Sequence, residues 1–159
     1  MSNLEKRVDA LMRLCAAEED ADRGLIREEI KRMLERRQNG RMDPEQEIRK
    51  ILLELGAPDH LVGHPYVIRG ILLVIGDQLY INHITFGLYP QLAVEFDTTP
   101  ARVERAIRHL IEVTWSRGDM DVLEKYFGNT ISAARGKPTN GEFIARMANV
   151  VKLRMRQAA

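Results

Sequence analysis

The chain has 159 residues, of which 45% are hydrophobic and 30% are charged, a balance typical of one folded domain with an appendage. Its 24 basic and 23 acidic residues nearly cancel, so attraction to a polyanion would have to come from local clustering. This composition argues against global disorder, and the apolar runs are too short for a membrane span or a signal peptide, so we expect a cytoplasmic protein.

Residues 1–42 predict an N-terminal helical hairpin. Over residues 3–19, apolar side chains recur at four- and three-residue steps, at Leu4, Val8, Leu11 and Cys15. Gly24 is expected to break this register before a second helix at about 25–38. Neither helix can bury its apolar stripe alone, so the hairpin should pack on the rest of the chain or on a second copy, as a candidate dimerisation element. A lone Cys15 supplies neither an internal disulfide nor a structural zinc site.

Residues 43–159 predict a single helical domain. The stretch "EQEIRKILLELGAP" indicates a helix closed by Gly56 and then Pro58, with an inward face of Ile48, Ile51, Leu52 and Leu55. Pro65 suits a first helical turn, and the apolar residues that follow, 66–75, should form the most buried helix. No strand-like alternation longer than a few residues occurs, so the predicted fold class is all-α.

A short helix, a tight corner and a longer helix then follow each other. Pro90 lies in the first turn of "LYPQLAVEF", 88–96, a helix of only about two turns. Asp97 suits a left-handed or tightly turned backbone, and Thr99 with Pro100 suits an N-cap and first turn. This order is that of a helix-turn-helix, whose second helix enters a DNA major groove.

The second helix of this pair, 100–117, separates apolar from basic residues. On a 3.6-residue period its inward side carries Val103, Ile107, Leu110, Ile111 and Thr114, and its outward side carries Arg102, Arg105, Arg108, His109 and Glu112. Arg102, Glu104 and Arg105 stand near the helix start, the part of a recognition helix that reaches base edges. Arginine can donate to both acceptors of a guanine edge, and glutamate can accept from cytosine. Arg108 and His109 are better placed for phosphates or the groove wall.

A charged helix face is often simply solvated, and the pattern alone leaves that alternative open. Two features favour DNA. The face is dominated by arginine, whose planar fork suits bases and phosphates. The C-terminal segment is also locally basic, with Arg135, Lys137, Arg146, Lys152, Arg154 and Arg156 against Glu142. Within it, Thr139 and Glu142 of the last predicted helix have capping-box spacing.

Other motifs predict no site. His60 and His64 lie four residues apart, a metal-ligand spacing on a helix, but the neighbouring prolines and glycine predict a loop. We therefore expect neither a metal ion nor a cofactor. The sequence shows no nucleophile elbow, glycine-rich phosphate loop or paired-carboxylate motif, so an enzyme is not expected.

The stretch "ARVERAIRHLIEVTWSRGDMD", followed by "YFG" and "KPTNGEFIA", resembles the C-terminal effector domain of stage 0 sporulation protein A, the response regulator that commits endospore-forming bacteria to sporulation. The resemblance extends upstream through "LGAPDHLVGHPY" and "DQLYINHITFGLYP" and runs from about Ile48 to Arg154. It implies a six-helix DNA-binding transcription regulator whose helix-turn-helix recognises boxes of the type TGNCGAA, often in tandem. It places base reading on Glu104 and Arg105, with Arg108 alongside, and phosphate contacts on Arg102, His109 and Lys137.

The chain departs from the family's usual pattern in its N-terminal part. The family carries there a receiver domain of alternating strands and helices, with a phosphorylatable aspartate in a magnesium site. Residues 1–42 show no strand pattern, so neither phosphorelay control nor that metal site is expected. The hairpin is instead expected to form a homodimer that is fixed or differently regulated.

A second departure lies at 116–128, "SRGDMDVLEKYFG". The resemblance implies a contact with the RNA polymerase sigma subunit in this segment, where the family commonly reads "DSISSLFG". Phe127 and Gly128 match, whereas residues 122–125 differ. Activation, repression and competition for sites therefore remain alternatives. A different class of function, a protein-interaction module that modulates a partner regulator without reading DNA, also remains open.

Overall fold

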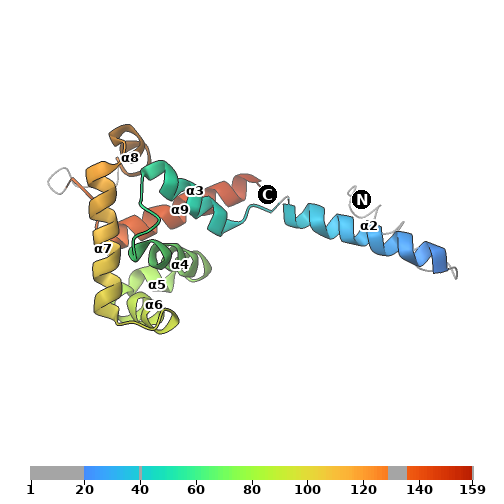
Figure 1. The fold of residues 1–159 in the computed structure, drawn as a ribbon, viewed down its shortest axis with the longest axis horizontal. Coiled ribbons are helices and arrows are strands. Elements are labelled where there is room, and N and C mark those ends of the chain that lie inside the picture. The colour runs from blue at the N-terminus through green and yellow to red at the C-terminus, as the bar shows by residue number, and fades with distance from the viewer. Residues whose placement is uncertain (1–19, 40, 129–135, 159) are drawn as a thin grey trace. The chain divides into compact units, whose positions relative to one another are not determined.

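The computed structural model describes residues 20–39, 41–128 and 136–158, and within these ranges every regular element is helical (Figure 1). The predicted all-α class is confirmed. The elements are α2 (Asp20–Asn39), α3 (Pro44–Leu55), α4 (Gly63–Gly76), α5 (Leu79–Asn82), the π-helix η1 (Ile84–Leu88), α6 (Tyr89–Glu95), α7 (Pro100–Arg117), α8 (Met120–Phe127) and α9 (Asn140–Ala158). The chain divides into two compact units, Met1–Arg41 and Met42–Ala159.

In the first unit, α2 runs without a break through Gly24. The expected interruption there is therefore wrong, because one glycine costs a helix only about 1 kcal/mol and strong helix formers flank this one. Ile26 is buried, whereas Leu25 and Leu34 are exposed. The first helix of the predicted hairpin, with Cys15, lies outside the described residues.

In the second unit, α3 and α4 begin and end largely where the sequence predicts. The Asp43 carboxylate accepts from the backbone N–H of Glu45 at 3.1 Å, and Gly56, at φ 78°, closes α3 in a left-handed conformation. The four predicted inward residues of α3 are fully buried. Helix α4, with Pro65 in its first turn, buries more residues than any other described helix.

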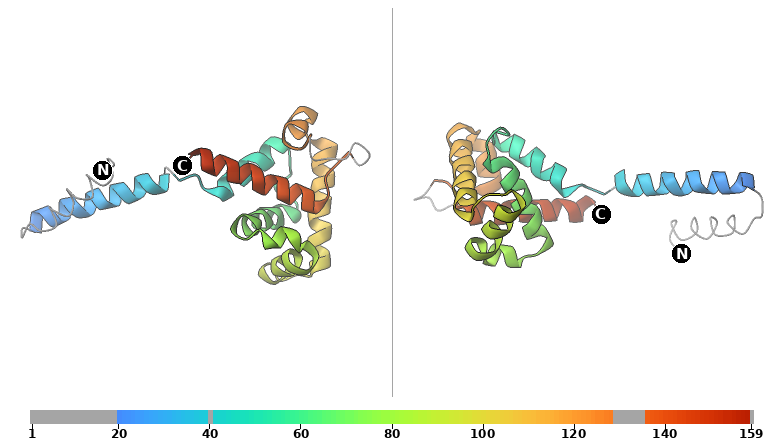
Figure 2. Two further views of the ribbon diagram at one scale, coloured as in Figure 1. Left: turned by 180° about the vertical axis from the view of Figure 1, so that it is seen from behind. Right: turned by 60° about the horizontal axis from the view of Figure 1, so that its bottom comes forward.

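Helix α4 is the centre of this unit and packs against α7, α9 and α3. The views in Figures 1 and 2 show α7 running along one side of the unit and α9 leading away from it. An aromatic cluster fills the space where α7, α8 and α9 meet. Phe127 stacks on Phe143 with ring centroids 5.2 Å apart, and both meet the edge of Trp115.

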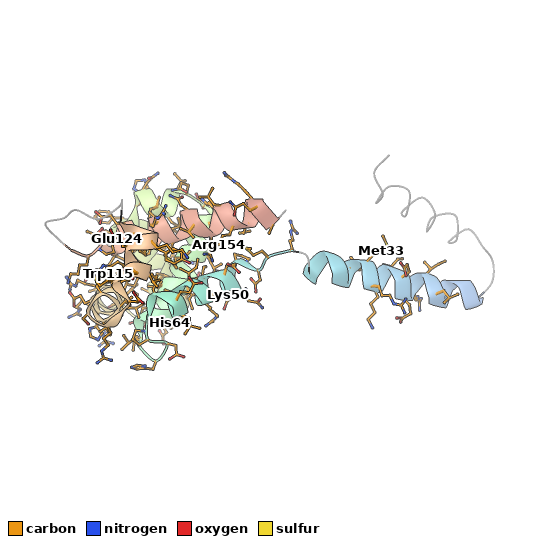
Figure 3. The ribbon with its side chains drawn as sticks, turned by 90° about the horizontal axis from the view of Figure 1, so that it is seen from above. Met33, Lys50, His64, Trp115, Glu124 and Arg154 are labelled. Atoms are coloured by element: carbon orange, nitrogen blue, oxygen red, sulfur yellow. The ribbon has the colours of Figure 1, made fainter. Side chains whose placement is uncertain are left out.

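A polar network connects α3, α8 and α9, and Figure 3 labels two of its members, Lys50 of α3 and Arg154 of α9. Arg154 donates to the Glu47 carboxylate at 3.1 Å and to the Tyr126 hydroxyl at 2.7 Å, and that hydroxyl donates to Glu54 at 2.6 Å. The hydrogen bond from Lys50 holds the pKa of Glu47 below its ordinary value, although burial acts in the opposite direction. This buried carboxylate is thus ionised and paired with Arg154, which joins α3 to α9, and the Tyr126 hydroxyl joins α8 to both.

Candidate nucleic-acid interface

Helix α7, the predicted recognition helix, has the two faces that its periodicity predicts. Its buried residues are Val103, Ile107, Leu110, Ile111 and Thr114, the same five that the sequence places inward. The one buried hydroxyl among them, that of Thr114, donates to the Leu110 carbonyl at 2.7 Å. Arg102, Arg105, Arg108, His109 and Glu112 are exposed. The apolar face therefore anchors the helix and leaves the basic face turned outward.

The corner between α6 and α7 also follows the local signals. Asp97 has φ 49°, and it is the one described non-glycine residue with a positive φ. The Thr99 hydroxyl accepts from the N–H of Arg102 at 3.3 Å, which caps α7, and Pro100 occupies its first turn. At the end of α6, Phe96 packs on Tyr66 of α4 with ring centroids 4.8 Å apart. The short helix is thereby fixed to the core before the chain turns.

The six predicted DNA-contacting residues do not all have the same surroundings. Arg102, Arg105 and His109 are exposed, and the Arg105 Nε donates back to the Ala101 carbonyl at 3.3 Å. The Glu104 side chain is only 33% exposed and forms an ion pair with Arg108 at 3.4 Å. Glu104 therefore lies at the edge of the basic face rather than at its centre.

Lys137 lies in the segment before α9 and reaches the surface of α7. Its ammonium group forms an ion pair with Glu112 at 3.1 Å. The predicted capping box is confirmed. The Thr139 N–H donates to the Glu142 carboxylate at 3.0 Å, and the N–H of Glu142 donates to the Thr139 hydroxyl at 3.2 Å. Arg135, the other basic residue of this segment, lies outside the described residues.

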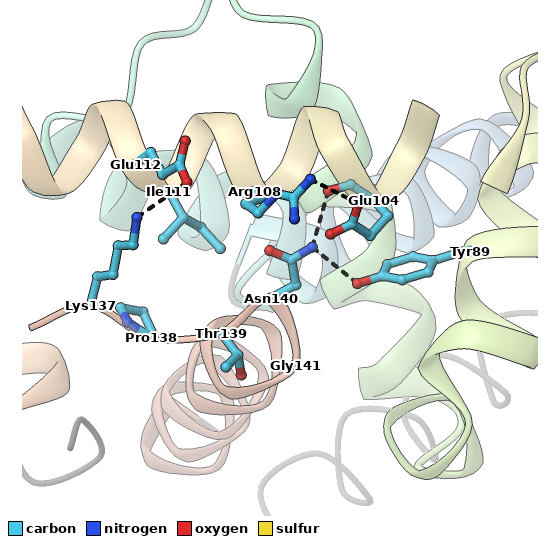
Figure 4. Close-up of a pocket in the computed structure, with 10 residues that line it drawn as sticks. All are labelled: Tyr89, Glu104, Arg108, Ile111, Glu112, Lys137, Pro138, Thr139, Asn140 and Gly141. Carbon is cyan, nitrogen blue, oxygen red and sulfur yellow. Dashed lines mark hydrogen bonds and ion pairs between the residues drawn. The ribbon is translucent and has the colours of Figure 1, made fainter. Parts of the chain in front are cut away.

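A groove of about 420 Å³ separates α7 from the start of α9 (Figure 4). It is lined by Tyr89, Glu104, Arg108, Ile111, Glu112, Lys137, Pro138, Thr139, Asn140 and Gly141. Two ion pairs line this groove. Glu104 and Arg108 pair along α7, and Glu112 of α7 pairs across the groove with Lys137. A phosphate that approached either cation would thus compete with a carboxylate that is already bound.

Asn140 is a residue of this groove that the sequence did not single out. Its side-chain amide donates to the Tyr89 hydroxyl at 3.0 Å and to the Glu104 backbone carbonyl at 3.1 Å (Figure 4). Both partners are distant in the sequence, so neither periodicity nor capping patterns could have indicated them. Burial raises the pKa of Tyr89, which keeps its hydroxyl protonated.

The basic C-terminal segment is not one surface. Arg146 donates to the Tyr126 carbonyl at 2.6 Å, Lys152 donates to Gln78 at 2.9 Å, and Arg154 belongs to the network with Glu47. Arg146 and Arg154 thus connect α9 to α8 and α3, whereas phosphate binding by the rest of the segment stays a prediction.

The prediction that His60 and His64 both lie in a loop is wrong for His64. His64 lies in the first turn of α4 and is buried, whereas His60 lies in the preceding loop and is exposed. Burial holds the pKa of His64 below its ordinary value of 6.5, which favours the neutral ring. In the described ranges, no group of three or more histidine, cysteine or acidic side chains could hold a metal ion. None of the described helices combines the length and apolar character needed to cross a membrane.

Comparison with protein families gives a match that covers most of the second unit. The family model described as "Sporulation initiation factor Spo0A C terminal" matches residues 48–151, which is more than half of the chain and includes every helix from α4 to α8. The matched range also contains all six predicted DNA-contacting residues.

Proposed function

Because the chain belongs to the family of C-terminal domains of the sporulation initiation factor Spo0A, we propose that it reads TGNCGAA-like boxes with α7 in the major groove. The family is a sporulation-initiation effector domain that generally binds DNA and regulates transcription, and it is not a class of enzyme. What we propose beyond this general role is the DNA sequence that α7 recognises and the residues that contact it.

The observation that carries the proposal is the arginine-rich face of α7. The opposite, apolar face of the helix is buried, so the arginines point outward, and Thr99 caps the helix directly after the turn. Glu104 and Arg105, in the first half of the helix, are assigned to base edges, with Arg108 alongside. Arg102, His109 and Lys137 are assigned to phosphates, the last from the far side of the groove. Binding would exchange the ion pairs of Arg108 and Lys137 for contacts with DNA.

A titration of the full chain with two duplexes, one TGNCGAA and one scrambled, tests this assignment. Arg105→Ala is expected to cost about 1–3 kcal/mol of binding free energy on the TGNCGAA duplex and to erase the preference, because two donors to a base are lost. Affinity should also fall steeply with added salt, as counterions are released. Fluorescence anisotropy at several salt concentrations measures both effects.

Arg117→Ala is the matched control, because Arg117 is an exposed arginine in the last turn of the same helix. It removes the same charge but should keep the preference between the duplexes. Equal binding of both duplexes by the unaltered chain would contradict DNA reading. That result would favour the alternative function, a module that modulates a partner regulator through protein contacts.

For the first unit we propose self-association through α2, and the apolar side chains on its surface support this. Leu25, Ile30 and Leu34 are exposed on a helix that is otherwise rich in charge. Light scattering during size exclusion should give a dimer mass, and the double change Leu25→Glu and Leu34→Glu should give a monomer. Leu53→Glu, at an exposed leucine of α3, is the control and should leave the mass unchanged. A monomeric unaltered chain, together with unchanged DNA affinity after deletion of 1–42, would contradict the proposal.

Any contact with the RNA polymerase sigma subunit is proposed to involve α8. Met120 is exposed there, as are Glu124 and Lys125, so the helix offers a surface as well as a core-facing side. Its differences from the usual family sequence keep repression as an alternative to activation. A purified sigma subunit that binds the chain on its DNA site would favour activation, and a sigma subunit that does not bind would favour repression.

A further inference from the structure

We propose that Asn140 is a positioning residue for sequence recognition, which holds the base-reading turn of α7 in register with the rest of the helix-turn-helix. This inference rests on the proposed function and adds to it a residue that does not itself touch a base. The Asn140 amide nitrogen lies 3.1 Å from the Glu104 carbonyl oxygen and 3.0 Å from the Tyr89 hydroxyl (Figure 4). One side chain at the start of α9 therefore binds both helices of the helix-turn-helix, α6 through Tyr89 and α7 through Glu104.

The contact with α7 is made to the backbone, at a residue assigned to base reading. A carbonyl oxygen has two lone pairs, and inside a helix one of them accepts from the N–H four residues later, here that of Arg108. The Asn140 amide occupies the other lone pair, so it adds a hydrogen bond without removing one from the helix. A backbone contact fixes the positions of the backbone atoms from which the side chains of Glu104 and its neighbour Arg105 extend, whichever rotamers those side chains adopt.

The same segment also carries the predicted phosphate contact. Lys137 precedes Asn140 by three residues, and the capping box between Thr139 and Glu142 makes the start of α9 rigid. The Asn140 amide therefore ties the segment that carries Lys137 to the backbone of α7 at Glu104. Phosphate contacts orient a protein on DNA and carry no sequence information directly, whereas base contacts require side chains placed within about 0.5 Å. Loss of the amide should thus reduce discrimination far more than general affinity.

Two replacements isolate the contact. Asn140→Asp is nearly the same size and places a carboxylate at a helix N-terminus, where it is favourable. It can accept from the Tyr89 hydroxyl, which reverses the direction of that hydrogen bond, but it cannot donate to the Glu104 carbonyl. Asn140→Ala removes the amide without adding charge. Asn149→Asp, at an exposed position of the same helix, is the matched control for the charge. All three are made in the full chain.

The first measurement is the ratio of affinities for the TGNCGAA and scrambled duplexes. Asn140→Ala should lower this ratio by roughly five- to tenfold and change the affinity for the scrambled duplex much less. Asn140→Asp should lower the ratio by a similar factor, while its added charge also weakens binding to both duplexes. Asn149→Asp should keep the ratio. An unchanged ratio in the Asn140 variants overturns the inference, and so does an equal loss on both duplexes.

The second measurement needs no DNA. Hydrogen exchange of the backbone amides should become faster over residues 102–108 in both Asn140 variants and stay the same in the rest of the second unit. Unchanged exchange there also overturns the inference. If the unaltered chain does not prefer the TGNCGAA duplex, the proposed function fails on that result, and the exchange rates alone then decide whether Asn140 holds α7.

Discussion

Gly63→Ala is expected to destabilise the second unit by about 3 kcal/mol, the upper end of the usual cost of overpacking, and to displace α7. A Cβ atom built on Gly63 would lie 2.2 Å from the Ala106 carbonyl oxygen and 3.2 Å from the Ile107 nitrogen. Both atoms belong to the backbone of α7, so no side-chain rotamer can relieve the clash. The two helices would have to move apart, and the turn proposed to read bases would move with α7.

Gly76→Ala is the matched control, because Gly76 is at the other end of α4 and a Cβ atom added there would meet nothing within 4 Å. It should leave stability unchanged or raise it slightly, since alanine favours a helix over glycine. Urea unfolding followed by the fluorescence of Trp115, the chain's only tryptophan, measures both variants. If Gly63→Ala matched Gly76→Ala in stability and in preference between duplexes, the close contact between α4 and α7 would not be what positions α7.

The parts of the interface that the sequence predicts are those set by local rules. The left-handed backbone at Asp97 and the cap at Thr99 depend on neighbours within a few residues. The inward face of α7 depends on the helical period alone, and all five predicted residues are buried. Local chemistry therefore predicts where α7 begins and which face it turns outward.

The parts that the sequence does not predict depend on which segments meet in space. In the sequence Arg154 is one of several basic residues near the C-terminus. Its partner Glu47 lies more than a hundred residues away in the chain, so only the fold shows that the two are paired. Gly63 has no local signal for its close approach to α7. Asn140 likewise gains its role only when α6, α7 and α9 are assembled. These are contacts of tertiary packing, on which neither periodicity nor capping carries information.

Phe127→Ala is expected to destabilise the second unit by about 3–5 kcal/mol, at least as much as Gly63→Ala. Phe127 is fully buried at the end of α8, where its ring stacks on Phe143 and lies edge-to-face with Trp115, with ring centroids 5.1 Å apart. Truncation leaves a cavity in the place where α7, α8 and α9 meet, and the ring of Trp115, then more accessible to water, should emit at longer wavelength. Phe127→Leu, which keeps most of the volume, should cost less than about 1.5 kcal/mol. The same urea titration compares them, and equal stability of the two variants would mean that α8 is held by its polar network with Arg154 rather than by this aromatic cluster.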